Sequence, residues 1–171
     1  MLHARTSVGV LPDWRAAIGA GIAAAIVFLI LEMVMVPVFL GGNAWDPPRM
    51  MAAILLGERV LPMPGQTPVP IDAAIVTAAL TVHTTLSIIY AVILAVLVMR
   101  VPPAAGLAVG AAFGVTLYIV NFYGFTALFP WFAMARNWVS IVAHAVFGIV
   151  AAWTYQLLSR HPADSDVRTS V

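Results

Sequence analysis

Four long stretches of the chain are almost entirely apolar, and more polar segments separate them. They cover residues 16–40, 73–99, 104–123 and 137–158. A helix needs about 20 mostly apolar residues to cross the hydrocarbon core of a bilayer, and each stretch meets that requirement. The pattern therefore predicts an all-α membrane protein. Its four transmembrane helices are expected to form an antiparallel bundle, with residues 1–171 making one membrane domain.

The connections between these stretches differ in length and character. Only residues 100–103, Arg-Val-Pro-Pro, separate the second stretch from the third, so these two helices are expected to be antiparallel neighbours. The first connection, residues 41–72, contains an apolar segment at residues 50–60 with charged residues at its ends. A segment of about 11 residues is too short to span a bilayer. It is therefore predicted to be a short helix that lies in the membrane interface.

The distribution of arginine predicts the orientation in the membrane. Five arginines fall on the side of the two termini and the short turn, namely Arg5, Arg15, Arg100, Arg160 and Arg168. Three fall on the other side, namely Arg49, Arg59 and Arg136. Because positive charge is retained on the cytoplasmic side, both termini are expected to be cytoplasmic.

Composition excludes several classes of function. Hydrophobic residues make up 63% of the chain and charged residues 9%, against roughly half and a quarter in soluble domains. A net charge of +1 leaves no basic surface for nucleic acid. The absence of cysteine excludes disulfides, thiolate metal ligands and thiol nucleophiles. No motif for nucleophilic catalysis or phosphate binding is present, so an enzyme is not the expected function.

Each predicted membrane helix carries a polar residue near its outer end. These residues are Glu32, His83, Asn121 and His144. At a rise of about 1.5 Å per residue they lie roughly 3–15 Å below the outer boundary of the membrane. Ionisable groups at such depths usually face the interior of a bundle and mark a functional site. We therefore predict that the four converge in the outer half of the membrane.

Helical periodicity adds smaller residues to the same faces. Ser140 shares a stripe with His144, and Ser87 and Tyr90 share a face with His83. Asn121 lies on the face of Gly106, Gly110 and Gly114, whose four-residue spacing is typical of a helix-packing surface. The first three polar groups are predicted to support the cluster, and the glycines to pack against a neighbouring helix.

Three functions are compatible with such a cluster. Glu32 could exchange protons or ions with His83 or His144, since the pKa of histidine is ordinarily near 6.5. Alternatively, the two histidines could bind haem, or join Glu32 around a divalent metal ion. The third alternative is a structural subunit of a homo-oligomer or larger membrane complex, in which the cluster fixes the helix register. The sequence identifies no cofactor and no partner other than the lipid bilayer.

The chain resembles the YagU family of bacterial inner-membrane proteins over residues 18–158. The matching features are Glu32 followed by Pro37, His83 in VHTTLSIIYAVILAV, the segment GLAVGAA at residues 106–112, and His144 in SIVAHAVFGIVAAW. The resemblance implies a four-helix inner-membrane protein of unsettled activity. The family pattern has a further histidine where this chain has Asn121, which argues against a metal site of three histidines.

Overall fold

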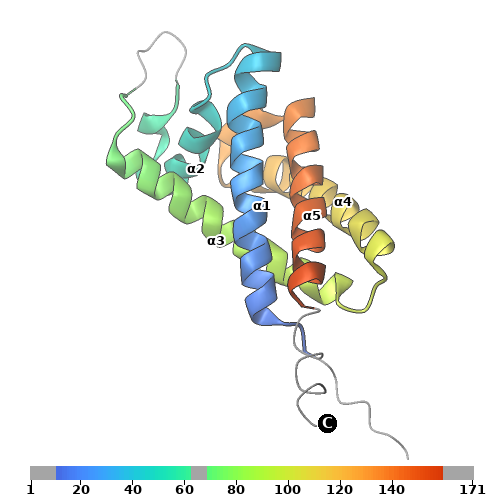
Figure 1. The fold of residues 1–171 in the computed structure, drawn as a ribbon. Helices are drawn as coiled ribbons and strands as arrows, with labels where there is room; N and C mark the ends of the chain where they lie inside the picture. The colour runs from blue at the N-terminus through green and yellow to red at the C-terminus, as the bar shows by residue number, and fades with distance from the viewer. Residues whose placement is uncertain (1–10, 63–68, 160–171) are drawn as a thin grey trace, which may run out of the picture.

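The computed structural model describes residues 11–62 and 69–159, and within them the chain is helical, without strands. Figure 1 shows the helices α1 (Trp14–Met35), α2 (Asp46–Leu56), α3 (Ala73–Val98), α4 (Pro103–Ile119) and α5 (Trp138–Leu158). π-Helical turns extend α1 and α4, as η1 (Val36–Leu40) and η3 (Val120–Gly124). Three short 3-10 helices lie in the connections, namely η2 (Glu58–Val60), η4 (Phe125–Ala127) and η5 (Pro130–Ala135).

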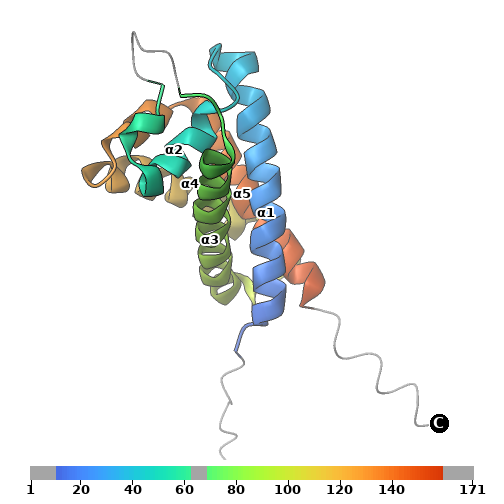
Figure 2. The same cartoon turned by 90° about the vertical axis from the view of Figure 1, so that its left-hand side faces the viewer.

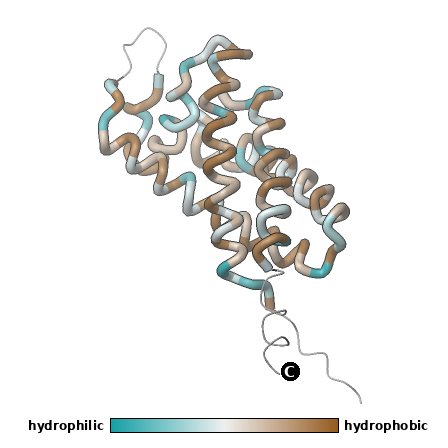
Figure 3. Tube along the Cα trace, viewed as in Figure 1, coloured by the Kyte–Doolittle hydropathy of each residue, from teal (hydrophilic) through white to brown (hydrophobic). Residues whose placement is uncertain are grey.

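Within the described residues, four helical segments are long and apolar enough to cross a membrane. They are Trp14–Leu40, Ala73–Val98, Pro103–Ala127 and Trp138–Leu158. The predicted helical class and the four candidate spans are therefore confirmed, as expected for a multi-pass membrane protein. Large apolar side chains are exposed on these helices, and Figure 3 shows that hydrophobic residues predominate along them. On α1 such residues recur every four positions at Ile18, Ile22, Ile26 and Ile30, which are 43–57% exposed.

Polar side chains define where these helices begin. Asp13 accepts hydrogen bonds from the first backbone N–H groups of α1. Asp72 accepts one from Ile75 at 2.8 Å, and Asn137 accepts one from Ser140 at 3.0 Å. Such caps satisfy N–H groups that have no partner within the helix. The start of α4 is instead set by prolines at 102 and 103, where a missing N–H does no harm.

The helices α1 and α5 lie side by side, and the other two long helices pack against this pair (Figures 1 and 2). Helix α3 packs on α1, and α4 packs along α5. The short turn between α3 and α4 does not make them close partners along their lengths, since α4 contacts α5 far more extensively than α3. The two helices diverge from their shared turn, and α2 packs against α3.

Small residues allow close contact between the helix backbones. A Cβ atom on Gly110 would collide with the carbonyl oxygen of Gly148, and one on Gly114 would collide with that of His144. Gly106 lies against the side chain of Gln156. All three glycines on α4 therefore face α5, as packing through small residues requires in a membrane.

Helix α2 begins four residues before the predicted segment 50–60 and ends at Leu56. Its alanines Ala52 and Ala53 are buried and belong to one apolar cluster with Ile75 and Ala78 of α3. The indole N–H of Trp131 in η5 donates to the carbonyl of Met50 at 3.1 Å. Helix α2 therefore packs against α3 and is hydrogen-bonded to η5.

Arg49 holds the connection around α2 together. Its side chain is only 6% exposed. The guanidinium donates hydrogen bonds to the carbonyl of Val60 at 2.9 Å and to that of Val69 at 2.6 Å. Backbone carbonyls thus satisfy this buried cation, and they join the start of α2 to the segment that precedes α3.

Candidate functional site

The four polar residues singled out in the sequence lie on four different helical segments. Glu32, His83 and His144 are buried on α1, α3 and α5, and Asn121 is half-buried in η3. The aromatic ring of Phe28 lies between the two histidines. Its centroid is 5.4 Å from that of His83 and 4.8 Å from that of His144. Phe28 therefore separates the two imidazoles, and neither ring donates to the other.

His144 belongs to a hydrogen-bonded chain that crosses three helices. Its Nδ1 lies 2.7 Å from the carbonyl oxygen of Ser140 and must donate, because a carbonyl only accepts. In the neutral ring, Nε2 then accepts from the amide nitrogen of Asn121 at 3.2 Å. The amide oxygen of Asn121 accepts from the hydroxyl of Tyr90 at 2.8 Å. Every member of this chain has a partner, which suits a neutral imidazole.

The π-helical turn η3 presents Asn121 to both of these partners. The turn widens the end of α4, and such turns are frequent at functional sites. Arg136 fixes the same turn, because its Nε donates to the carbonyl of Phe122 at 2.6 Å. Its guanidinium also lies 4.4 Å from the centre of the Tyr123 ring. The position of Asn121 thus depends on a cation at the end of its helix, where a cation is favourable.

His83 connects α3 to α1. Its Nε2 donates to the carbonyl oxygen of Ala25 at 2.9 Å. Close contact of the same two helices lies one turn away, where a Cβ on Gly21 would meet the backbone of Ile88. Ser87, which is 3% exposed, lines a small space of about 30 Å³ together with His83, Tyr90, Asn121 and His144.

Glu32 differs from the other members of the cluster. It is 4% exposed, and its Oε1 has no hydrogen-bond partner among the described residues. The hydroxyl of Ser140 lies beside this carboxyl group but makes no hydrogen bond of ordinary geometry with Oε1, so it is likewise buried without a partner. An unpaired carboxylate in an apolar environment costs several kcal/mol or more, on the order expected for a charge without compensation. Glu32 is therefore the one member of the cluster with an unmet requirement for a proton or a cation.

Two cavities adjoin Glu32. The first, which we call the Glu32–His83 cavity, has a volume of about 220 Å³ and lies between α1, α2 and α3. The second, the Glu32–Ser140 cavity, has a volume of about 240 Å³ and extends toward η5 and α5. Both are lined by Phe28, Glu32, Pro47 and Met51. Glu32 is thus common to the lining of both spaces.

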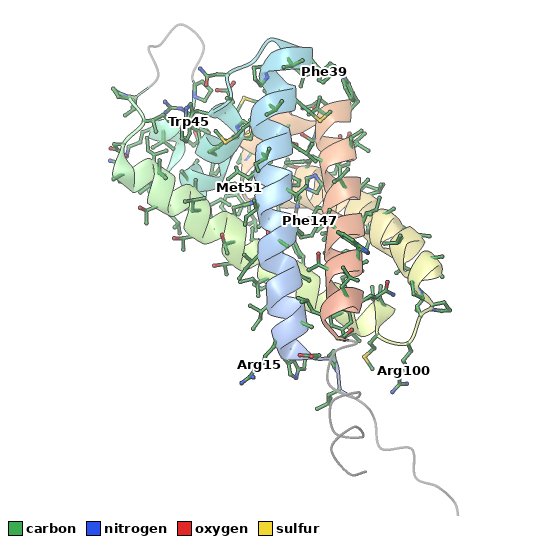
Figure 4. All side chains as sticks on the ribbon, in the orientation of Figure 1. Arg15, Phe39, Trp45, Met51, Arg100 and Phe147 are labelled. Carbon is green, nitrogen blue, oxygen red and sulfur yellow. The ribbon has the colours of Figure 1, made fainter. Side chains whose placement is uncertain are left out.

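A third, wider space lies between α2, α3 and the aromatic connection. It measures about 350 Å³ and is lined by Thr81 and Leu86 of α3, by Leu55 of α2, and by Asn121 and Phe129. Figure 4 labels Trp45 and Met51 beside α1 on the side of α2, and Phe147 between α1 and α5. Met51 lines this space and the other three as well. A single thioether side chain is therefore common to the lining of all four spaces.

The metal and haem alternatives find no support in this geometry. Among the residues that the structure describes, no group of three or more His, Cys, Asp or Glu could hold a metal ion. Both nitrogens of His144 and the Nε2 of His83 are engaged in hydrogen bonds. Phe28 also occupies the region where a haem plane would have to lie between two axial imidazoles. Glu32, His83 and His144 therefore do not form a ligand set.

Sequence reasoning missed the apolar residues that complete the site. Phe28 is one of many apolar residues in a membrane segment, and Trp45 and Met51 belong to the first connection, so the sequence does not single them out. Their place at the site follows from the packing of α1 and α2 against α3. Comparison with known proteins gives no further guide, since no family model, curated protein or solved structure matches this chain.

Proposed function

We propose that this chain is a multi-pass protein of a bacterial inner membrane, related to the YagU family, with both termini in the cytoplasm. Arg15 and Arg100 lie at one end of the molecule (Figure 4), whereas Arg49, Arg59 and Arg136 belong to connections at the other. Arg5, Arg160 and Arg168, which complete the predicted asymmetry, lie outside the described residues. In this orientation α2 and η5 lie on the outer side, and α2 borders the interface.

Within this protein, Glu32 acts as a proton- or ion-handling group. The observation that carries the proposal is its burial without a partner for Oε1, on a helix apolar enough to span the membrane. Intramembrane carboxylates are costly, and they are characteristic of proton relays and ion pathways. A proton or a cation from the outer side would compensate the charge, and the adjoining cavities provide the space for its access.

The remaining polar groups divide between two roles. His83 lines the same cavity as Glu32 and is the nearest candidate to exchange a proton with it. The chain of Tyr90, Asn121 and His144 is fully hydrogen-bonded, which favours a structural role in fixing α3, η3 and α5. The structural alternative therefore applies to this part of the cluster, and the ion-handling role belongs to Glu32.

Infrared difference spectroscopy of the protein in lipid nanodiscs tests this proposal. A titration between about pH 5 and 9 should show the carbonyl stretch of a protonated carboxyl group that loses its proton. The variant Glu32→Gln should lack this band, whereas Glu58→Gln should keep it, because Glu58 is exposed at the end of α2. Identical pH-difference spectra for the native protein and Glu32→Gln would refute the proposal.

A further inference from the structure

We infer that the Glu32–His83 cavity binds a small lipophilic organic cation, such as a quaternary ammonium with apolar substituents, in exchange for the proton on Glu32. The inference rests on the proposed function, because it names the ligand with which the Glu32 proton competes. It begins from a residue that lines the cavity and has a carboxyl oxygen buried without a partner.

The charges around the cavity select a cation. Glu32 and His83 are the ionisable residues among those that line it, and Asp46 adds a second carboxylate in the adjoining Glu32–Ser140 cavity. Of the residues that the structure describes, no arginine lines either space, and the chain contains no lysine. The nearby Arg49 is occupied by the carbonyls of Val60 and Val69. An anion would find no arginine or lysine to pair with here.

The walls select an organic cation over a metal ion. Hard cations such as Mg²⁺ and Ca²⁺ require about six oxygen ligands, and this cavity offers the carboxyl group of a single glutamate. Most of its lining is apolar, with aromatic rings from Phe28 and Trp45 and thioethers from Met33 and Met51. Aromatic faces attract quaternary ammonium groups through cation–π interactions. Such a ligand needs only one counter-charge, because alkyl or aryl groups cover most of its surface.

The volume restricts the size of the ligand. Pockets for drug-sized molecules measure about 300–1,000 Å³. The Glu32–His83 cavity, at about 220 Å³, is smaller than this range. Benzyltrimethylammonium is a suitable probe, since it combines one fixed positive charge with one aromatic ring.

Binding and proton release are linked by the balance of charge. A protonated Glu32 releases one proton when the cation binds, and the products are an ion pair in the cavity and a proton in solution. No bond of the cation is broken, and no further reactant is needed. The apparent Kd should therefore rise as the pH falls, by up to about tenfold per pH unit where Glu32 is protonated.

Calorimetric titration of the protein in nanodiscs with benzyltrimethylammonium tests the inference. The heat should differ between buffers of different ionisation enthalpy, and the difference should correspond to about one proton released per cation at the acidic end. Glu32→Gln should weaken binding by about tenfold or more, and Glu58→Gln should leave it unchanged. The neutral isostere neopentylbenzene should not release protons.

A second variant tests the inference independently, in case Glu32→Gln does not fold. Leu80 lines the cavity and is 45% exposed, so Leu80→Trp fills the space from its outer side without changing a charge. This variant should lose cation binding and keep the infrared band of the Glu32 carboxyl group. Equal cation affinity in the native protein, Glu32→Gln and Leu80→Trp would overturn the inference.

The two proposals can fail separately. A Glu32 band that titrates normally, together with no heat from benzyltrimethylammonium, would refute the cation site and leave the proton-handling role standing. Absence of the band and of cation binding would refute both.

Discussion

Asn121 uses both atoms of its side-chain amide to join two helices to its own. The nitrogen donates to His144 and the oxygen accepts from Tyr90, so a substitution leaves two groups without partners. Polar contacts between membrane helices contribute about 0.6 kcal/mol on average and up to about 1.7 kcal/mol. Loss of both contacts is large enough to measure.

We predict that Asn121→Leu lowers the free energy of unfolding by about 1–3 kcal/mol in detergent micelles. Tyr90→Phe removes one of the same hydrogen bonds, so the double variant should lose less than the sum of the single losses. The measurement is reversible unfolding followed by circular dichroism. Thr116→Val is the matched control, because Thr116 is exposed and bonds only to its own helix. Strict additivity of the Tyr90 and Asn121 changes would contradict the hydrogen-bonded chain.

At the scale of elements, the contact between α4 and α5 is set by backbone approach. The carbonyl oxygens of one helix occupy the positions where the other would carry a Cβ atom. A methyl group added at one of these glycines would therefore displace the backbone of the facing helix, and a closely packed interface resists such a displacement.

Gly114→Ala should destabilise the protein by about 1–3 kcal/mol and lower its Tm in micelles. Gly148→Ala should do the same from the opposite helix. Gly124→Ala is the control, since nothing lies within 4 Å of a Cβ at that position and its backbone has a φ of −79°. Equal Tm values for the native protein and all three variants would show that this helix contact does not contribute to stability.

Helix α2 offers a separate test of where the membrane boundary lies. Leu55 is 59% exposed, and Glu58 follows within one turn. If α2 borders the interface, lipid covers Leu55 and water reaches Glu58. A membrane-impermeant maleimide should therefore label a cysteine at 58 rapidly and one at 55 slowly. Equal labelling in nanodiscs, combined with equal labelling in denaturant, would exclude this placement.

The spans could be predicted from the sequence because the bilayer imposes a length on every apolar helix. The position of α2 could not. The apolar segment at residues 50–60 did not show which of its residues face the protein, and those buried against α3 are the small Ala52 and Ala53. Likewise, equal depth predicted that Glu32, His83, Asn121 and His144 converge, but it did not show which side chain lies between them. The rotation of α1 places Phe28 between the two histidines, and periodicity alone does not fix such rotations.

At the scale of the whole molecule, the orientation in the membrane is open to direct measurement. We predict that alkaline phosphatase fused to the C-terminus is inactive, because the proposed orientation places that end in the cytoplasm. A truncated fusion at Arg59 should be active, since the preceding helix would deliver it to the outer side. Reporter activities in the opposite order would invert the topology and place Glu32 toward the cytoplasm.

The interlocked glycines also have a mechanical consequence. Helices whose carbonyl oxygens lie against glycines of the neighbouring helix resist sliding past each other. We therefore expect α4 and α5 to move as one rigid body. Helix α3 touches this pair less extensively, and it carries α2 with it. Relative movement of α3 and α4 is therefore expected at the 100–103 turn that joins them, and not at the contact between α4 and α5.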